Sequence, residues 1–260
     1  MAIGLTLLDD TYIMASADRL YAFRGNDTVT GSAGNDTILG GRGDDVLYGM
    51  DGDDLIFGGA DNDYIDGGNG DDILRGDGGA DTLIGGTGED DLNGGAGDDF
   101  VDGGEDHDVV RGGAGHDVLS GGSGDDLVHG GLGNDFMDGG IGNDYMFGDF
   151  GADTMMDGDG SDWLHGGAGN DRFNLAADTS FGTLDVIHGG TGIDTAWFAP
   201  QNGSVTVTNM GGWFDVTWTS GVGDPQHDQL FGVEFLLVED VATGIVETVD
   251  LATVAVVWTT

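Results

Sequence analysis

The sequence has no cysteine and no lysine, only two prolines, and six arginines against 49 aspartates and glutamates. The absence of cysteine excludes disulfides and thiolate metal sites. The scarcity of basic residues leaves a formal net charge of −43, which argues against nucleic acid or an anionic membrane surface as a partner, because both are bound through Lys and Arg. The partner that this charge requires is a cation.

Long apolar runs are also missing. No stretch approaches the roughly 18 apolar residues of a membrane span. The start of the chain, MAIGLTLLDDTYIMA, has no basic segment, and Asp9 and Asp10 interrupt its apolar residues, so it does not resemble a cleavable secretory signal. We therefore expect no membrane span, and we expect export, if it occurs, to depend on a different secretion signal.

What the sequence does contain is a repeat. From Ala22 to Asn174 a nine-residue unit recurs without a slip, rich in the chain's 55 glycines, and a repeat of this kind determines architecture before any local feature does. The sixth place of the unit is Asp in all seventeen copies: Asp27, Asp36, Asp45, Asp54, Asp63, Asp72, Asp81, Asp90, Asp99, Asp108, Asp117, Asp126, Asp135, Asp144, Asp153, Asp162 and Asp171. The eighth place is always apolar, from Val29 and Ile38 to Leu164 and Phe173.

This unit resembles GGxGxDxUx, the nonapeptide of the RTX, or haemolysin-type calcium-binding, family, and the resemblance covers residues 22–174. It implies an all-β fold, a parallel β-roll solenoid in which six residues make a turn, three make a short strand, and two nonapeptides complete one coil. It also implies calcium ions between the turns of successive coils, held by the Asp side chains and by backbone carbonyls.

The residue types agree with this chemistry. Glycine adopts positive φ and lets carbonyls approach a ligand, and calcium takes six to eight oxygen ligands. One inward apolar side chain per nine residues is too little burial to offset the ordering of a glycine-rich unit, so we expect folding and calcium binding to be one event. Seventeen turns on two sides leave about fifteen gaps between same-side turns, hence about fifteen calcium ions.

Some units depart from the consensus, and these departures indicate where turns or calcium sites differ from the rest. Asp61 and Asp106 replace the fourth-place glycine, and Asp tolerates the left-handed region better than most residues, so we expect these turns to survive. Asp157 replaces a first-place glycine, and the opening unit AFRGNDTVT has no glycine pair; calcium sites there are expected to be weak or empty. Asp18 and Leu20 keep the nine-residue phase, so residues 1–21 are expected to form a degenerate capping coil.

The composition changes after Asn174. Residues 175–260 hold four of the five tryptophans and both prolines, and GSVTVTNM and VEFLLVED have the character of strands. One late unit, GGTGID, returns out of phase and adds Asp194 to the expected metal ligands. This region resembles the β-rich segment that follows the repeats in many RTX proteins. We expect it to cap the last coil. The resemblance also implies an uncleaved C-terminal secretion signal that an ABC-type secretion apparatus recognises.

The motifs of common hydrolases are absent. The six histidines form no HExxH zinc motif, and no serine lies in a GxSxG sequence. His107 and His116 occupy the variable fifth place, where an exposed turn residue is the simpler interpretation. In the RTX family, protease, lipase and epimerase activities belong to separate catalytic domains, so we expect no catalysis here.

Two noncatalytic roles remain. In the first, the chain is a secreted bacterial protein that folds on calcium outside the cell and serves as a structural or self-assembling component, such as a surface layer, filament or matrix subunit. In the second, it is a binding module for an acidic polysaccharide such as alginate. The oligomeric state at millimolar calcium, with and without alginate, distinguishes them.

The ninth place suggests a recognition surface for either role. With two units per coil, alternate units lie on opposite sheets, so the ninth place forms two columns. One contains acids and no bases: Thr30, Tyr48, Asp66, Ile84, Asp102, Ser120, Asp138, Met156. The other contains bases and no acids: Leu39, Phe57, Arg75, Asn93, Arg111, His129, Phe147, His165. An apolar patch of Leu39, Leu55, Phe57 and Ile73 lies beside the bases of this second column. These columns predict either contact between copies of the chain or contact of the basic column with a polyuronate; the alternative is that exposed strand residues vary freely.

Overall fold

The chain is a parallel β-solenoid of two facing sheets. The computed structural model describes residues 2–4, 8–16, 19–175, 184–198, 205–209, 214–218, 226–240 and 245–251. In these parts every regular element is a strand, and from the first strand to the twenty-second the strands alternate between the two sheets along the chain. The expected all-β parallel roll is therefore confirmed.

The two sheets divide the strands almost entirely into odd and even numbers. The 14-stranded sheet runs in the order β1 (Ala2–Gly4), β3 (Arg19–Arg24), β5 (Thr37–Arg42), β7 (Leu55–Ala60), β9 (Ile73–Gly78), β11 (Asp91–Ala96), β13 (Val109–Ala114), β15 (Leu127–Leu132), β17 (Tyr145–Phe150), β19 (Trp163–Ala168), β21 (Leu184–Thr191), β25 (Gln226–Phe231), β24 (Phe214–Trp218) and β23 (Val205–Asn209). The 13-stranded sheet runs in the order β2 (Thr11–Ile13), β4 (Thr28–Thr30), β6 (Val46–Asp51), β8 (Tyr64–Asn69), β10 (Thr82–Thr87), β12 (Phe100–Glu105), β14 (Val118–Ser123), β16 (Phe136–Ile141), β18 (Thr154–Met156), β20 (Arg172–Asn174), β22 (Thr195–Phe198), β26 (Phe235–Asp240) and β27 (Ile245–Asp250).

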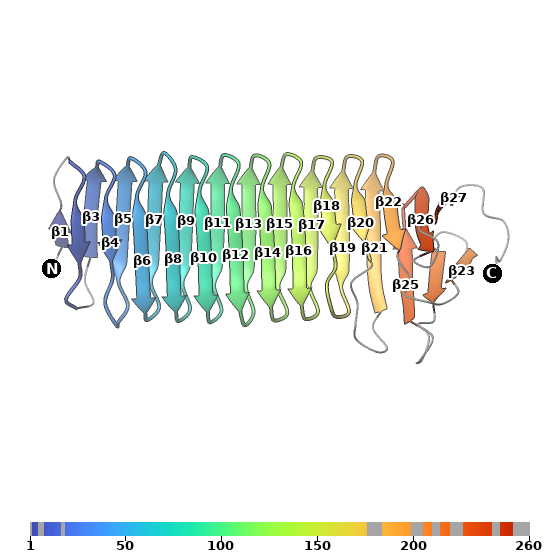
Figure 1. Cartoon of the computed structure of the whole chain (residues 1–260), viewed down its shortest axis with the longest axis horizontal. Helices are drawn as coiled ribbons and strands as arrows, with labels where there is room; N and C mark the ends of the chain where they lie inside the picture. Colours follow the sequence, from blue (N-terminus) through green and yellow to red (C-terminus); the bar gives the residue numbers. More distant parts are fainter. Residues whose placement is uncertain are drawn as a thin grey trace.

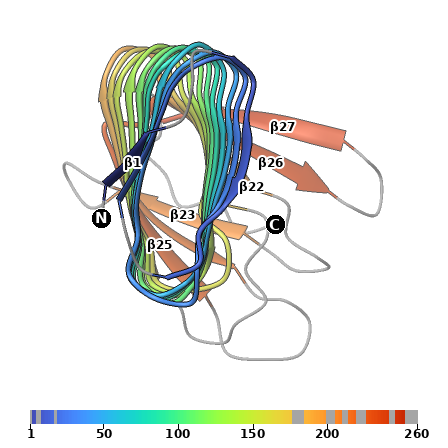
Figure 2. The same ribbon diagram turned by 90° about the vertical axis from the view of Figure 1, so that its left-hand side faces the viewer.

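The register of the ladder follows directly from the nonapeptide. Leu92 pairs with Leu74 on one side and with Val110 on the other. Each partner holds the same place in the repeat two units away, so one coil contains two units, as expected. The strands stack side by side along the long axis (Figure 1), and the coils superpose into a flattened tube when viewed from the N-terminal end (Figure 2). Every repeat position therefore forms a straight column along the roll.

Most strands are longer than the sequence predicted. They span six residues, places seven to nine of one unit and places one to three of the next, so the glycine pair belongs to the ladder and the turn is short. Three strands of the repeat region have three residues, and each is followed by a broken pair, although β6, β9 and β17 keep six residues with Met50, Asp77 and Asp149 in place of the second glycine. β4 is followed by Gly31 and Ser32, β18 by Asp157 and Gly158, and β20 by Leu175.

Glycine has a conformational role at the second and fourth places. Gly113 and Gly115, for example, have φ values of 113° and 151°, a region that residues with a Cβ rarely adopt. Asp61 and Asp106, at the fourth place, adopt φ of 78° and 79°. The prediction that these two turns survive substitution by Asp is thus confirmed.

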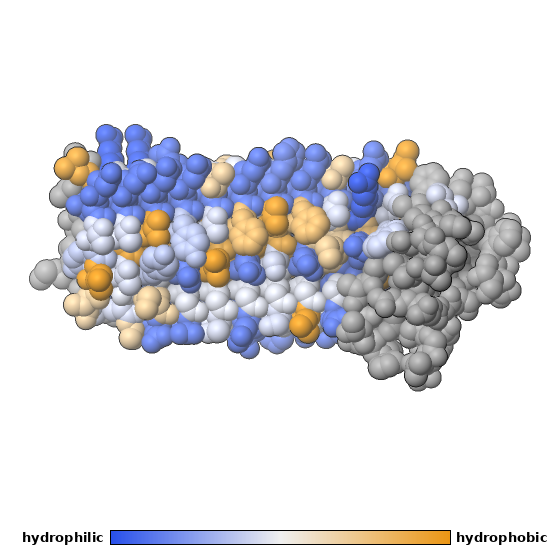
Figure 3. Space-filling model, viewed as in Figure 1, coloured by the Kyte–Doolittle hydropathy of each residue, from blue (hydrophilic) through white to orange (hydrophobic). Residues whose placement is uncertain are grey.

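The outer surface differs between the turns and the sheets. Figure 3 shows the face of the 13-stranded sheet, where a band of apolar and neutral side chains runs along the middle of the roll and polar side chains line the upper turn edge. This separation reflects the unit, because polar residues and Asp occupy the turn whereas the seventh and ninth places point outward from each strand.

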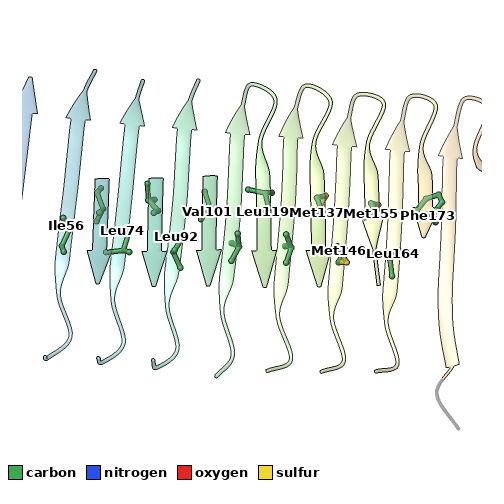
Figure 4. Packing of buried hydrophobic residues seen from close by; sticks show 14 of the residues in the cluster. Ile56, Leu74, Leu92, Val101, Leu119, Met137, Met146, Met155, Leu164 and Phe173 are labelled. Atoms are coloured by element: carbon green, nitrogen blue, oxygen red, sulfur yellow. The ribbon is translucent and has the colours of Figure 1, made fainter. Parts of the chain in front are cut away.

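The core is a single layer of eighth-place side chains between the sheets. Leu92 from β11 and Val101 from β12 are both fully buried, as is nearly every member of this column. In Figure 4 the labelled side chains of both sheets point into the narrow space between them. Inward placement of the eighth position is therefore confirmed, but each coil contributes just two apolar side chains to the column.

The N-terminal coil is slightly shorter than the others. Ile3 pairs with Leu20 and Tyr12 with Val29, whereas strands of the regular coils pair at a distance of two full units. β1 and β2 thus cover the first repeat strands, as the expected capping coil would. Asp18 lies outside the described residues.

Stacking continues beyond Asn174 after a change of spacing. Trp163 pairs in parallel with Val186, and Val186 pairs with Gln229, so both pairs are separated by more than two units of sequence. β23, β24 and β27 then add antiparallel pairs at the C-terminal end of the sheets, and β23 and β26 lie in the two segments expected to be strands. None of the described segments is a helix long and apolar enough to cross a membrane.

Candidate metal-binding turns

The sixth-place aspartates line both turn edges of the roll. Because paired strands come from every second unit, alternate aspartates form two columns, one at each edge. Each of the seventeen side chains is at most 3% exposed. Burying so many carboxylates is costly unless each is paired or binds a cation.

Hydrogen bonds connect each column into a ladder. The backbone N–H of Asp99 donates to Oδ1 of Asp117, 2.9 Å away in the next coil, and Asp117 donates in the same way to Asp135 at 2.9 Å. The pattern begins at Asp10, which donates to Oδ1 of Asp27 at 2.7 Å. One oxygen of each aspartate thus orders the backbone of the neighbouring coil.

The second carboxylate oxygen has no such role. In fifteen of the seventeen aspartates the Oδ2 atom is buried and has no hydrogen-bond partner among the described residues: Asp27, Asp45, Asp54, Asp63, Asp72, Asp81, Asp90, Asp99, Asp108, Asp117, Asp126, Asp135, Asp144, Asp153 and Asp171. A buried acceptor of this kind lacks compensation for its lost hydration. A row of such oxygens with one spacing is a row of candidate cation ligands.

The first-place glycine leaves open the space beside this oxygen. A Cβ atom added to Gly121 would lie 2.5 Å from the carbonyl oxygen of Gly139 and 2.6 Å from Oδ2 of Asp126. Since Gly121 has no positive φ, glycine is required here by space and not by conformation. A carboxylate oxygen and a carbonyl oxygen therefore converge where any side chain would intrude.

The electrostatics of the columns favour a bound positive charge. Burial raises the pKa of Asp63 and Asp108 to about 8, although the N–H hydrogen bond from the preceding coil acts in the opposite direction. The same burial raises the pKa to about 7 for a further group: Asp54, Asp72, Asp90, Asp99, Asp144 and Asp153. Without a cation, these carboxylates resist ionisation at neutral pH.

The fifth place forms a second, exposed ladder in the opposite direction. The backbone N–H of Asn62 donates to Oδ1 of Asp44 at 3.0 Å, and Ala80 donates to Oδ1 of Asn62 at 2.7 Å. His107 and His116 belong to this ladder, because their Nδ1 atoms accept from Asp125 and Asn134 at 2.6 and 2.8 Å. The two histidines are exposed turn residues that also link neighbouring coils.

The sixth-place aspartate ladder continues past the regular repeats. Asp171 donates to Oδ1 of Asp194 at 2.9 Å, and Asp194 donates to Oε2 of Glu234 at 2.8 Å. The out-of-phase Asp194 therefore stacks on the repeat column, fully buried, with no partner for its Oδ2 among the described residues. On the other edge Asp162 donates to Asp185, and Asp185 to Asp228.

Asp185 and Asp228 were not identified from the sequence because insertions break the nine-residue phase. The signal that finds them is local: DVIHG and DQLFG both retain an Asp, an apolar residue two places later and a glycine four places later. Both side chains are buried, at 1% and 0% exposure.

Two departures from the consensus have local consequences. Oδ2 of Asp36 accepts from the backbone N–H and hydroxyl of Ser32 at 2.7 and 3.0 Å, so this oxygen is engaged within its own turn. Asp157, in place of a glycine, is 1% exposed, and burial together with the charge of Asp185 holds its pKa well above the ordinary value. This end of the roll concentrates buried negative charge.

The donor set restricts the metal that these turns can hold. Nowhere in the described residues do three or more His, Asp or Glu side chains surround one point, so a site here combines a carboxylate with backbone carbonyls. Oxygen-only ligation suits a hard cation, and calcium accepts the six to eight flexible oxygen ligands that carbonyl-rich turns provide. The unpartnered Oδ2 atoms and the space kept by glycine fit such an ion.

Comparison with known proteins agrees with this chemistry. No curated protein matches the chain. A family model described as the RTX calcium-binding nonapeptide repeat matches in overlapping segments that together span residues 14–181. This is more than half of the chain, and the chain belongs to the family of RTX calcium-binding repeat proteins.

Proposed function

We propose that the chain is an extracellular structural protein whose roll is held together by calcium. The observation that carries this proposal is the repeated buried Oδ2 atom, which has no hydrogen-bond partner in the residues that the structure describes and occurs at both edges along the roll. We assign as ligands the seventeen sixth-place aspartates and Asp194, together with carbonyl oxygens of the glycine-rich turns. Asp36 is the weakest member of this set, because Ser32 already occupies its second oxygen.

Charge and affinity support a location outside the cell. About fifteen calcium ions reduce the net charge from −43 to about −13, an ordinary value for a soluble protein. Extracellular calcium modules bind with dissociation constants of about 0.1 to 1 mM, so the chain remains unfolded at cytosolic calcium levels. An unfolded chain suits export through an ABC-type channel, the route that the family resemblance implies.

A structural role is favoured over binding of an acidic polysaccharide. The polysaccharide role requires a continuous row of basic side chains along the roll, but the ninth-place column contains two arginines, Arg75 and Arg111, which share the carboxylate of Asp91 at 3.2 and 2.6 Å. A catalytic role has no support in the roll, since the buried carboxylates are explained by metal ligation and RTX rolls are typically structural or binding elements.

The test is a calcium titration of the full chain followed by far-UV circular dichroism at neutral pH. We expect a disordered spectrum in excess EGTA and a cooperative gain of β-structure between about 0.1 and 1 mM calcium, with magnesium at the same concentration as the control. Magnesium demands octahedral geometry and dehydrates reluctantly, so it should induce little structure. A β spectrum that persists in EGTA would contradict the proposal.

A further inference from the structure

The two outer faces of the roll differ in the sign of their charge. We define the arginine face as the outward seventh and ninth places of β3 to β21 in the 14-stranded sheet. The aspartate face is the corresponding surface of β4 to β22 in the 13-stranded sheet. Of the six arginines, Arg19, Arg75 and Arg111 lie on the arginine face. Arg24 and Arg42 occupy third places of the same sheet, and Arg172 lies on the aspartate face.

Strand pairing places the ninth-place residues in straight columns, as predicted. On the aspartate face, Asp66 pairs with Ile84, Ile84 with Asp102, Asp102 with Ser120, and Ser120 with Asp138. The acids therefore recur every second coil, about 9.6 Å apart.

On the arginine face, Arg75 pairs with Asn93, and Asn93 with Arg111. The two guanidinium groups are thus also two coils apart. The spacing of positive charge on one face matches the spacing of negative charge on the other.

The basic column is less free than its sequence suggests. Asp91, at the seventh place of the strand between them, accepts from both guanidinium groups, at 3.2 Å from Arg75 and 2.6 Å from Arg111. Two arginines share one carboxylate, so the cluster keeps a net positive charge. Nη1 of Arg75 also donates to the carbonyl oxygens of Leu74 and Asp91, at 2.8 and 2.7 Å, which fixes this guanidinium on the face.

Apolar side chains accompany the charges on both faces. Phe100, Val118 and Phe136 are consecutive in the register of the aspartate face and are 42%, 42% and 40% exposed. Figure 3 shows a band of apolar side chains along this face. On the arginine face, Ile73 is 41% and Tyr145 is 56% exposed.

The size of the faces suits a weak, salt-sensitive contact. Each face contains ten stacked strands, and the seventh to ninth places, at about 4.8 Å between strands and about 3.3 Å per residue, give a surface of about 50 by 10 Å. Two such faces bury about 1,000 Å² in total, which is at the lower limit of specific interfaces. A second copy offset by about half a coil places Asp66 and Asp102 opposite Arg75 and Arg111, and an offset of about one and a half coils places Asp102 and Asp138 there.

We propose that the arginine face of one molecule binds the aspartate face of a second copy, with parallel roll axes. The contact joins two different surfaces, so it leaves one face of each kind open and propagates into a row or layer of rolls. This inference rests on the proposed structural function, and it identifies the surfaces through which copies of the chain associate.

The test uses sedimentation velocity of the calcium-loaded full chain over a range of concentrations. Wild-type protein should form extended oligomers at low ionic strength and dissociate at high ionic strength. Reversal of one face, by Arg75→Glu with Arg111→Glu or by Asp102→Lys with Asp138→Lys, should raise the concentration needed for association at least about tenfold. Mixing the two variants should restore association, because each reversed face then meets a reversed partner.

A matched control is Asp51→Lys with Glu105→Lys. It makes the same change in charge as the aspartate-face variant at exposed third-place residues of the same sheet, and it should associate as wild type does. Calcium-dependent circular dichroism of every variant reports folding separately from association. Failure of calcium-dependent folding removes the proposed function itself. If the protein folds normally but the wild type stays monomeric, or if mixing the two variants does not restore association, this inference alone is overturned. The same holds if the wild type stays monomeric and binds alginate, and the arginine variant loses that binding.

Discussion

Asp99 and Asp117 lie on successive coils at one edge of the roll, and the backbone N–H of Asp99 donates to Oδ1 of Asp117 at 2.9 Å. The other oxygen of Asp117 is buried and has no hydrogen-bond partner within the described part of the chain. The two oxygens thus have separate tasks. One aligns the neighbouring coil, and the other supplies the charge that a metal ion requires.

The first prediction separates these tasks with Asp117→Asn. The amide retains an oxygen for the N–H of Asp99 but loses the negative charge, so the local calcium affinity should fall while the coil alignment persists. We expect about one calcium ion fewer by isothermal titration calorimetry, and faster hydrogen exchange in the coils that flank residue 117. The ends of the roll should exchange as in wild type, because stability in a solenoid is a sum of neighbour contacts.

The control for Asp117→Asn is Glu105→Gln, which removes the same charge from an exposed position. It should leave both the calcium stoichiometry and the exchange pattern unchanged. Equal loss of protection along the whole roll after Asp117→Asn would argue for a globally cooperative structure and against independent sites.

The second prediction concerns pH in the absence of metal. Burial raises the pKa of Asp63 and Asp108 to about 8 and of Asp99 to about 7, whereas an unfolded Asp titrates near about 3.9. The folded chain therefore binds more protons than the unfolded chain between these values, so acidification stabilises it and the contribution is lost as pH rises through about 7 to 8.

Metal-free protein should accordingly gain β-structure by circular dichroism as pH is lowered from 8 to 5. Protons compete with calcium for the same oxygens, so the calcium midpoint at pH 6 should exceed that at pH 8. A metal-free chain that loses residual structure on acidification would show that the carboxylates are ionised within the fold.

The regular part of the roll was predictable because one short period determines both the register and the core. Asp at the sixth place and an apolar residue at the eighth place suffice to position Leu92 inside and Asp90 at the turn. The nine-residue period could not predict Asp185 and Asp228, since insertions in the turns change the spacing without changing the stack. The fork of Arg75 and Arg111 on Asp91 was also not predictable, because it depends on side-chain directions across three strands.

The third prediction addresses backbone strain at the fourth place. Asp106 adopts φ of 79° where most units have glycine, and a residue with a Cβ in this region costs about 1 to 2 kcal/mol. Asp106→Gly should therefore raise the free energy of unfolding by about 1 kcal/mol in urea at saturating calcium. The adjacent Glu105 has no positive φ, so Glu105→Gly should instead lower it by about 0.5 to 1 kcal/mol. The same sign for both changes would mean that φ at residue 106 has no energetic role.

The fourth prediction distinguishes a glycine kept for space from one that is replaceable. A Cβ at Gly121 would lie 2.5 Å from the carbonyl oxygen of Gly139 and 2.6 Å from Oδ2 of Asp126, whereas a Cβ at Gly78 would meet its nearest atom at 4.0 Å. Neither glycine has a positive φ, so the two differ in space and not in backbone conformation. Gly121→Ala should weaken calcium binding at its turn and reduce the stability of the calcium-loaded roll by about 1 to 3 kcal/mol.

Gly78→Ala should be neutral or stabilising by up to about 1 kcal/mol, because it restricts the unfolded chain without a clash. Calorimetric calcium titration and urea unfolding of both variants measure the difference. If Gly121→Ala binds calcium as tightly as Gly78→Ala does, then the space beside Oδ2 of Asp126 does not hold the ion, and the ligands must be sought elsewhere in the turn.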